Sequence, residues 1–190
     1  MSHLTIPSDE ENRLKIELDK RTDAEAARIK RYLEMADLSR KDSGPIRELV
    51  NNIVGLEQFK DFDVITIPEI VPADASFDLF NFPPDHPARS KSDTYYVDDK
   101  NILRTHTTVM WYYYFQQEEV RAKIGANAPL GVLSHGKVYR KDEIDRNHMN
   151  IFHQMDGLYL HPTSERMITQ DDLKEVLANV VKAAFGPDVK

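Results

Sequence analysis

The sequence contains no cysteine, which excludes disulfide bridges and thiolate metal sites and fits a cytoplasmic protein. It also lacks any run of about 18 apolar residues, and its N-terminus, MSHLTIPSDEE, lacks the basic and apolar regions of a signal peptide. We therefore expect neither membrane insertion nor secretion. No dense run of lysine and arginine is present, and the formal net charge of −7 argues against a broad basic surface for nucleic acid.

The composition that remains is ordinary for one folded domain. Hydrophobic residues make up 41% of the chain and charged residues 30%, and 190 residues are enough to bury one sizeable core. We expect residues 1–40 to form a helical, peripheral N-terminal extension and residues 41–190 to form the main domain.

The most informative stretch is residues 136–160, GKVYRKDEIDRNHMNIFHQMDGLYL. An incoming strand with apolar Val138 and Tyr139 is followed by an almost wholly polar loop over 141–150. Residues 151–160 then read as an outgoing strand. The segment is therefore predicted to be a hairpin with a charged loop.

One face of this hairpin gathers side chains that suit a ligand with both signs of charge. Because strand side chains alternate, Phe152, Gln154 and Asp156 share a face, and Arg140 arrives from the neighbouring strand. A guanidinium binds phosphate or carboxylate, while an amide and a carboxylate accept hydrogen bonds from an ammonium. A merely solvated hairpin with an ordinary Arg140–Asp156 ion pair would contain the same residue types.

The exact string favours the ligand site. GKVYR at 136–140, His148 and FHQMDG at 152–157 together resemble the second signature motif of class II aminoacyl-tRNA synthetases, in the version of the phenylalanyl-tRNA synthetase alpha subunits. NFPPDHPARSKSDTYY at 81–96 and LRTHTT at 103–108 match the same family in order and spacing. Three matches in register over about residues 46–190 make coincidence far less probable than one short pattern would.

The resemblance implies an α+β fold, in which an antiparallel sheet is flanked by helices and is incomplete at the C-terminus. Residues 41–190 would then be a partial catalytic domain. In the family, later strands supply the pocket for the phenyl ring, a magnesium-binding glutamate and a third signature motif. This sequence contains none of these, and we expect the chain alone to be inactive.

The implied reaction is attack by the carboxylate of phenylalanine on the α-phosphate of ATP, followed by transfer of the aminoacyl group to tRNA. Such a reaction depends on positioning and on neutralising charge. Arg140 is expected to contact the α-phosphate and His148 to add a second contact to ATP. The resemblance assigns the substrate contacts to His106, Thr108, Gln154, Asp156, Tyr96 and Phe152. The family usually has glutamate at position 156 and often serine at position 108.

The implied partners are phenylalanine, ATP, tRNA and the beta subunit of the same synthetase, with Mg²⁺ ligands expected mostly outside this chain. Residues 44–72 loosely resemble the first signature motif, which builds a homodimer contact, although a core helix and strand would look the same. A metal site at His106, His148, His153 and Asp156 is a competing interpretation, but the histidine spacing does not match common zinc motifs, and we predict no metal ligands. The alternative function is a catalytically inactive synthetase-like module that binds an amino acid, a nucleotide or a protein partner.

Caps and periodicity predict the remaining helices. Ser8 with Glu11 and Thr22 with Glu25 make capping boxes for one helix or a broken pair. Pro45 is placed at the first position of a second helix that ends near Gly55. Thr107 or Thr108 is predicted to cap a helix over Val109–Lys123, and Thr169 to cap a last helix. The expected buried stripe of that last helix is Leu173, Val176, Leu177, Val180, Val181 and Ala184.

Strands are predicted at Phe62–Pro68, Asp93–Val97 and Ile102–Thr105 from their β-branched and aromatic residues. Pro72–Ser92 contains four prolines and is expected to form an ordered turn or a short helix.

Overall fold

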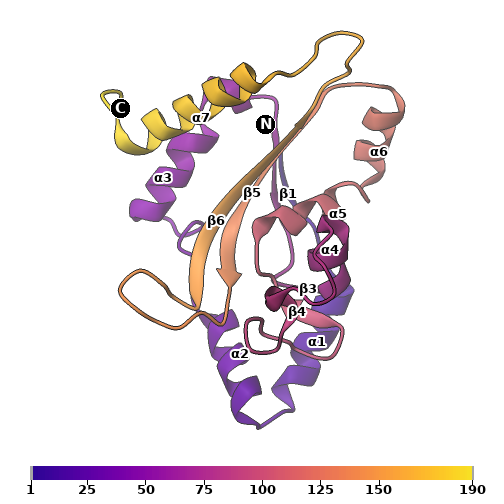
Figure 1. Ribbon diagram of the computed structural model, residues 1–190, viewed down its shortest axis with the longest axis vertical. Helices are drawn as coiled ribbons and strands as arrows, with labels where there is room; N and C mark the ends of the chain where they lie inside the picture. The colour runs from indigo at the N-terminus through magenta and orange to yellow at the C-terminus, as the bar shows by residue number, and fades with distance from the viewer. Residues whose placement is uncertain (1, 190) are drawn as a thin grey trace.

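Two strands of ten residues each form the centre of the fold. The structure is a computed structural model, and it describes residues 2–189. The strands β5 (Leu130–Tyr139) and β6 (Ile151–Leu160) make the predicted hairpin, and it crosses the middle of the molecule (Figure 1). The other strands are β1 (His3–Thr5), β2 (Asp63–Thr66), β3 (Ile70–Pro72) and β4 (Asn101–Leu103).

The helices lie around this hairpin, with α1 and α2 at one end, α3 and α7 beside each other at the other end, and α4 to α6 along a third side (Figure 1). They are α1 (Asp9–Asp19), α2 (Ala24–Glu34), α3 (Pro45–Val54), α4 (Ala73–Phe77), α5 (Met110–Tyr114), α6 (Glu118–Gly125) and α7 (Gln170–Phe185). Short 3₁₀ turns occur at Glu57–Phe59, Asp78–Phe80, Pro87–Arg89 and Thr107–Val109. Between residues 2 and 189, none of the helices has the length and apolarity that crossing a membrane requires.

The main sheet has the order β1-β2-β5-β6, and β3 pairs with β4 in a second, antiparallel sheet. The predicted α+β class is confirmed. The pairing is mixed, because β1–β2 and β2–β5 are parallel and β5–β6 is antiparallel. Long connections precede β2 and β5, and a parallel neighbour requires such a crossover.

The register of the hairpin fixes its two faces. Gly136 lies opposite Gln154 and Ser134 lies opposite Asp156, so the predicted face of Phe152, Gln154 and Asp156 is confirmed. The opposite face carries Met155, which packs against the core cluster beneath α3 and α7. The side chains proposed for ligand binding therefore point away from that cluster.

The N-terminal segment is part of the core, and the expectation that it is peripheral is wrong. Leu14 and Leu18 of α1 and Ile29 of α2 are buried in a cluster with Tyr139 of β5. The buried ammonium of Lys137 reaches the end of α2, where it donates to the carbonyls of Tyr32, Leu33 and Met35 at 2.6 to 3.3 Å. A boundary near residue 40 stays a prediction.

The two predicted caps of this segment have different outcomes. Ser8 accepts a hydrogen bond from the Glu11 amide at 3.1 Å and caps α1 as predicted. The prediction of Thr22 as a cap is wrong, since the Asp23 side chain accepts from the Ala26 amide and caps α2. Aspartate at the next position is an equally good acceptor, and it shifts the helix start by one residue.

The predicted helix over Val109–Lys123 is wrong as a single element. It is divided into α5 and α6 at residues 115–117. The Gln116 and Gln117 side-chain amides donate to the carbonyls of Tyr112 and Tyr113 at 2.6 and 3.0 Å. In a continuous helix, backbone amides would donate to these carbonyls, and here the glutamine side chains do so instead. The backbone of Gln117 is extended, so the helix is interrupted there. The predicted threonine cap is also wrong, because no side chain caps either helix.

The helix α3 begins at Pro45 with Gly55 as its C-cap, as predicted, and the predicted strands at 62–68 and 102–105 are found as β2 and β4. The expected strand at 93–97 is wrong, since Tyr96 makes an isolated bridge to Ile102. Short helical turns occur within 72–92 as expected.

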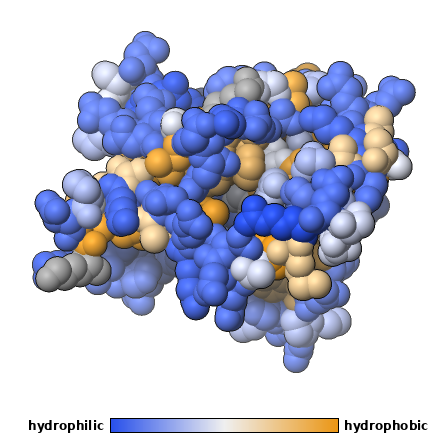
Figure 2. Space-filling view, turned by 90° about the horizontal axis from the view of Figure 1, so that it is seen from above, coloured by the Kyte–Doolittle hydropathy of each residue, from blue (hydrophilic) through white to orange (hydrophobic). Residues whose placement is uncertain are grey.

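The last helix begins with the predicted Thr169 cap, but its predicted stripe is divided between two faces. Val176 and Val180 pack on the cluster beneath α3, whereas Leu173 and Leu177 are more than half exposed. The helix contacts its neighbours along one side, so it cannot bury both sets. Seen from above, the mainly hydrophilic surface carries apolar patches on the side where α7 lies (Figure 2).

Candidate active site

A short turn at residues 105–108, called here the 105–108 turn, joins the predicted site residues. It follows β4 and leads into the 3₁₀ turn before α5. The Thr107 amide donates to Gln154 Oε1 at 3.1 Å, and the Thr108 hydroxyl donates to Asp156 Oδ2 at 2.5 Å. The structure therefore brings Thr108, Gln154 and Asp156 together although the two segments are nearly fifty residues apart in sequence.

Arg140 reaches the same turn from the end of β5. Its Nε donates to the Thr105 carbonyl at 3.2 Å, and its guanidinium carbon lies 5.1 Å from the centre of the Phe152 ring. Arg140 and Asp156 thus each bind the turn, and no ion pair joins them within residues 2–189. Within residues 2–189 only Nε of the Arg140 guanidinium makes a hydrogen bond, and the two outer nitrogens can donate to an anion.

His106 is half-buried between the buried residues Thr105 and Thr107. Burial lowers the pKa of His106, so the neutral imidazole is favoured. Its Nε2 lies 3.1 Å from the Ser76 carbonyl, and its ring meets Phe80 edge-on at 5.1 Å. Because a carbonyl can only accept, Nε2 carries the hydrogen. Nδ1 is then an acceptor, and it is buried without a protein partner in the described part of the chain.

Two predicted residues lie outside this group. His148 is exposed in the loop between β5 and β6, where the Asp145 carboxylate, 2.9 Å away, raises the pKa of His148. Tyr96 donates to the Arg89 carbonyl at 2.8 Å and lines a hollow of about 440 Å³ with Lys91 and Lys141. The structure does not bring these two side chains together with Gln154 and Asp156.

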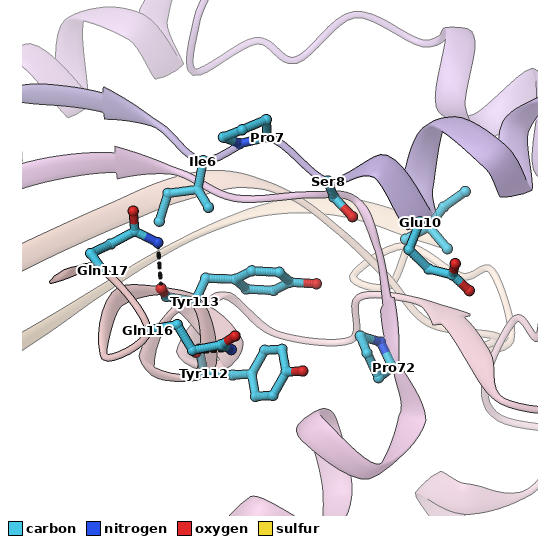
Figure 3. A pocket seen from close by; sticks show the side chains of 10 residues that line it. Ile6, Pro7, Ser8, Glu10, Pro72, Tyr112, Tyr113, Gln116 and Gln117 are labelled. Carbon is cyan, nitrogen blue, oxygen red and sulfur yellow. Dashed lines mark hydrogen bonds between the residues drawn. The ribbon is translucent and has the colours of Figure 1, made fainter.

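A second hollow, of about 250 Å³, lies between the start of α1 and α5, where Ile6, Tyr112 and Tyr113 face it (Figure 3). It contains none of the predicted site residues. No three histidine, aspartate or glutamate side chains within residues 2–189 are grouped closely enough to hold a metal ion.

The sequence reasoning missed the residues that hold the turn in place. Thr105 supplies the carbonyl for Arg140, and Thr107 supplies the amide for Gln154. Arg104, which precedes them, is 2% exposed. The signal for Arg104 was an arginine directly after the apolar pair Ile102–Leu103, where a solvated charge is not expected.

The sequence matches the family described as tRNA synthetases class II core domain (F) over residues 29–190. The chain belongs to the class II tRNA synthetase core family. Among the curated relatives of this class II synthetase chain is the phenylalanine–tRNA ligase alpha subunit of Pelodictyon phaeoclathratiforme, 33% identical over 151 residues. The alignment covers 77% of this chain and 41% of that protein. The same subunit of Persephonella marina is 34% identical over 78% of this chain and 40% of its own length.

Solved structures agree with this class II synthetase fold. The pyrrolysyl-tRNA synthetase of Desulfitobacterium hafniense matches with a TM-score of 0.57 at 18% identity, over 97% of this chain and 69% of that chain. A likeness at this identity concerns the fold alone. The predicted membership in the class II synthetases is confirmed, and the chain spans about two fifths of the length of the curated relatives.

Proposed function

We propose that this chain is part of a phenylalanine–tRNA ligase alpha subunit that activates phenylalanine with ATP and transfers it to tRNA. The observation that carries the proposal is the contact between the 105–108 turn and β6. The same turn accepts a hydrogen bond from Arg140 and donates one to Asp156, which supports a site with one cationic and one anionic side chain. The names and identities of the curated relatives supply the amino acid and the tRNA.

In the proposed reaction, an oxygen of the phenylalanine carboxylate attacks the α-phosphorus of ATP. A new oxygen–phosphorus bond forms, the bond to the bridging oxygen breaks, and pyrophosphate leaves with that electron pair. Arg140 neutralises charge on the phosphorus oxygens, because a guanidinium stays protonated at any relevant pH and offers two donors in one plane. Asp156 receives the ammonium of the amino acid and so orients its carboxylate.

His148 remains a proposed second contact to ATP, and Tyr96 and Phe152 remain proposed walls of the substrate site. Magnesium accompanies ATP in this proposal. Its ligands are proposed to lie mostly outside this chain.

The proposed partners are the beta subunit and tRNA. Residues 44–72, which include α3 and β2, remain a proposed homodimer contact, and Leu49 of α3 is 38% exposed in that segment. The proposed function places the protein in the cytoplasm, where tRNA is used in protein synthesis.

Exchange of labelled pyrophosphate into ATP measures the first step directly. It is tested with each of the twenty amino acids, with a candidate beta subunit and the remaining segment of an alpha subunit present. We expect exchange with phenylalanine, and we expect Arg140→Ala to abolish it while the circular dichroism spectrum stays unchanged. Arg121→Ala is the matched control, because Arg121 lies on α6 and donates to the Phe115 carbonyl outside the site. Undiminished exchange in Arg140→Ala would refute the role of Arg140. Saturable binding of phenylalanine without any exchange would favour the inactive module.

A further inference from the structure

Arg104 is a buried cation whose bonds join three segments of the chain. Its Nε donates to the Lys137 carbonyl of β5 at 2.7 Å. Its Nη1 donates to the carbonyls of Ile67 and Pro68, directly after β2, at 2.8 and 3.2 Å. Within residues 2–189, carbonyl oxygens rather than carboxylates satisfy this guanidinium. Burying a cation is costly, so each of these bonds matters to where Arg104 lies.

The backbone of Arg104 is fixed as firmly as its side chain. Its amide donates to the Glu69 carbonyl at 2.9 Å, and its carbonyl accepts from the Tyr139 amide at 3.0 Å. The 105–108 turn begins at the next residue. Thr105, Thr107 and Thr108 then make the contacts to Arg140, Gln154 and Asp156.

We propose that Arg104 is a positioning residue, which holds the 105–108 turn where it can contact Gln154 and Asp156 of β6. The expected consequence is a change in the affinity for an aminoacyl-adenylate, and this consequence rests on the proposed function. The physical reason is geometric. The guanidinium reaches the ends of β2 and β5 in different directions at once, and the ammonium of lysine cannot reach both sets of carbonyls.

Gly136 supports the same assignment from the opposite side. It lies across from Gln154 in the hairpin and has a φ of +155°. A Cβ added there would overlap Arg104 Nη2. The guanidinium therefore occupies the space that a side chain at position 136 would need, and Gly136→Ala would displace it.

The test measures binding of 5′-O-(N-phenylalanylsulfamoyl)adenosine, a stable analogue of the adenylate, by isothermal titration at a temperature where every variant is folded. Arg104→Lys is expected to weaken the affinity by about tenfold or more, as the loss of hydrogen bonds from a charged group predicts. Arg121→Lys is the matched control, because it makes the same exchange on α6, and it is expected to stay within about twofold of the wild type. Wild-type affinity in folded Arg104→Lys would overturn the inference.

A double-mutant cycle separates positioning from a general loss of stability. Thr108→Val removes one contact that the turn makes with β6. If Arg104 acts through the turn, the double variant Arg104→Lys, Thr108→Val binds no more than about threefold more weakly than the poorer single variant. Effects that multiply would show independent actions and would overturn the inference. Gly136→Ala is expected to behave like Arg104→Lys, with Gly44→Ala as control, because Gly44 also has a positive φ of +130° and nothing lies within 4 Å of a Cβ there.

Failure of the proposed function is distinguishable. If the wild type binds no analogue, the proposed function fails, and amide hydrogen exchange still tests the positioning. The Thr107 amide, which donates to Gln154, is expected to exchange about tenfold faster in Arg104→Lys than in Arg121→Lys. Equal exchange rates in the two variants would overturn the inference.

Discussion

Acidification should destabilise this protein through one buried histidine. His135 lies on β5, on the hairpin face opposite the candidate site, and is 4% exposed. Its Nδ1 is 2.8 Å from the Ser39 hydroxyl, which donates to Asp37 at 2.6 Å. Because that hydroxyl uses its hydrogen on Asp37, it accepts from His135, so Nδ1 of the imidazole carries a hydrogen.

Burial and, next, the nearby charge of Arg40 lower the pKa of His135 to about 4, against the opposing effect of Asp37. Above the unfolded pKa of 6.5 the imidazole is neutral in both states and contributes no pH dependence. Below it, the unfolded chain binds a proton that the folded chain excludes, so stability is lost as the pH falls. With about 1.4 kcal/mol for each pH unit, the free energy of unfolding falls by about 3 kcal/mol between pH 6.5 and pH 4.

Urea denaturation at half-unit steps between pH 7.5 and pH 4 measures this slope. His135→Gln cannot titrate, and its free energy of unfolding should depend less on pH by about the same 3 kcal/mol across the window, whatever its absolute stability. His3→Gln, on the exposed strand β1, is the control and should retain the wild-type slope. Identical slopes in the wild type and in His135→Gln would refute the reasoning.

Two further predictions concern the N-terminal segment, and both are measured by urea denaturation. Leu14→Ala should lower the free energy of unfolding by roughly 2–5 kcal/mol, because Leu14 is 1% exposed in the core, whereas Ile16→Ala, at a residue 60% exposed, should change it by less than about 0.5 kcal/mol. Equal effects would contradict the packing of α1. Ser8→Ala should cost about 1 kcal/mol through loss of the α1 cap, and Thr22→Ala should stay within about 0.5 kcal/mol because Asp23 caps α2. A larger loss in Thr22→Ala would reverse that assignment.

The features that could be predicted from the sequence depend on residues a few positions apart. The starts of α1 at Ser8 and of α3 at Pro45 and the N-cap of α7 at Thr169 follow from single turns of backbone. The β5–β6 hairpin follows from alternation along two short runs and a polar loop between them. In each case the local preference and the final environment favour the same structure.

The features that were missed depend on distant segments. No local pattern in β1 or β2 indicates that these strands pair in parallel, because β2 lies some sixty residues after β1 in the sequence. The break between α5 and α6 occurs where the side chains of Gln116 and Gln117 bind carbonyls of the preceding turn. The helix propensities of these residues would equally allow one uninterrupted helix, so the sequence does not indicate the break. Which apolar residues of α7 are buried likewise depends on the distant elements that pack against this helix.

The candidate site shows the same division between residue identity and geometry. The motif indicated Arg140, Gln154 and Asp156, and alternation placed the last two on one face. The partners of Gln154 and Arg140 in the 105–108 turn could not be read from a motif, because a backbone amide and a backbone carbonyl carry no sequence signature. Only a fold that packs the turn on β6 supplies them.

Those partners decide which atoms of the site remain for a ligand. The Thr107 amide can only donate, so Gln154 must turn its Oε1 toward the turn, and its NH₂ group faces elsewhere. The Thr108 hydroxyl occupies Asp156 Oδ2, while within residues 2–189 no hydrogen bond is formed to Oδ1. An incoming ammonium therefore meets Asp156 Oδ1 as its charged acceptor and finds one lone pair of the Gln154 oxygen already in use. The carboxylate at position 156 should thus contribute more to binding a cationic group than the amide at position 154 does.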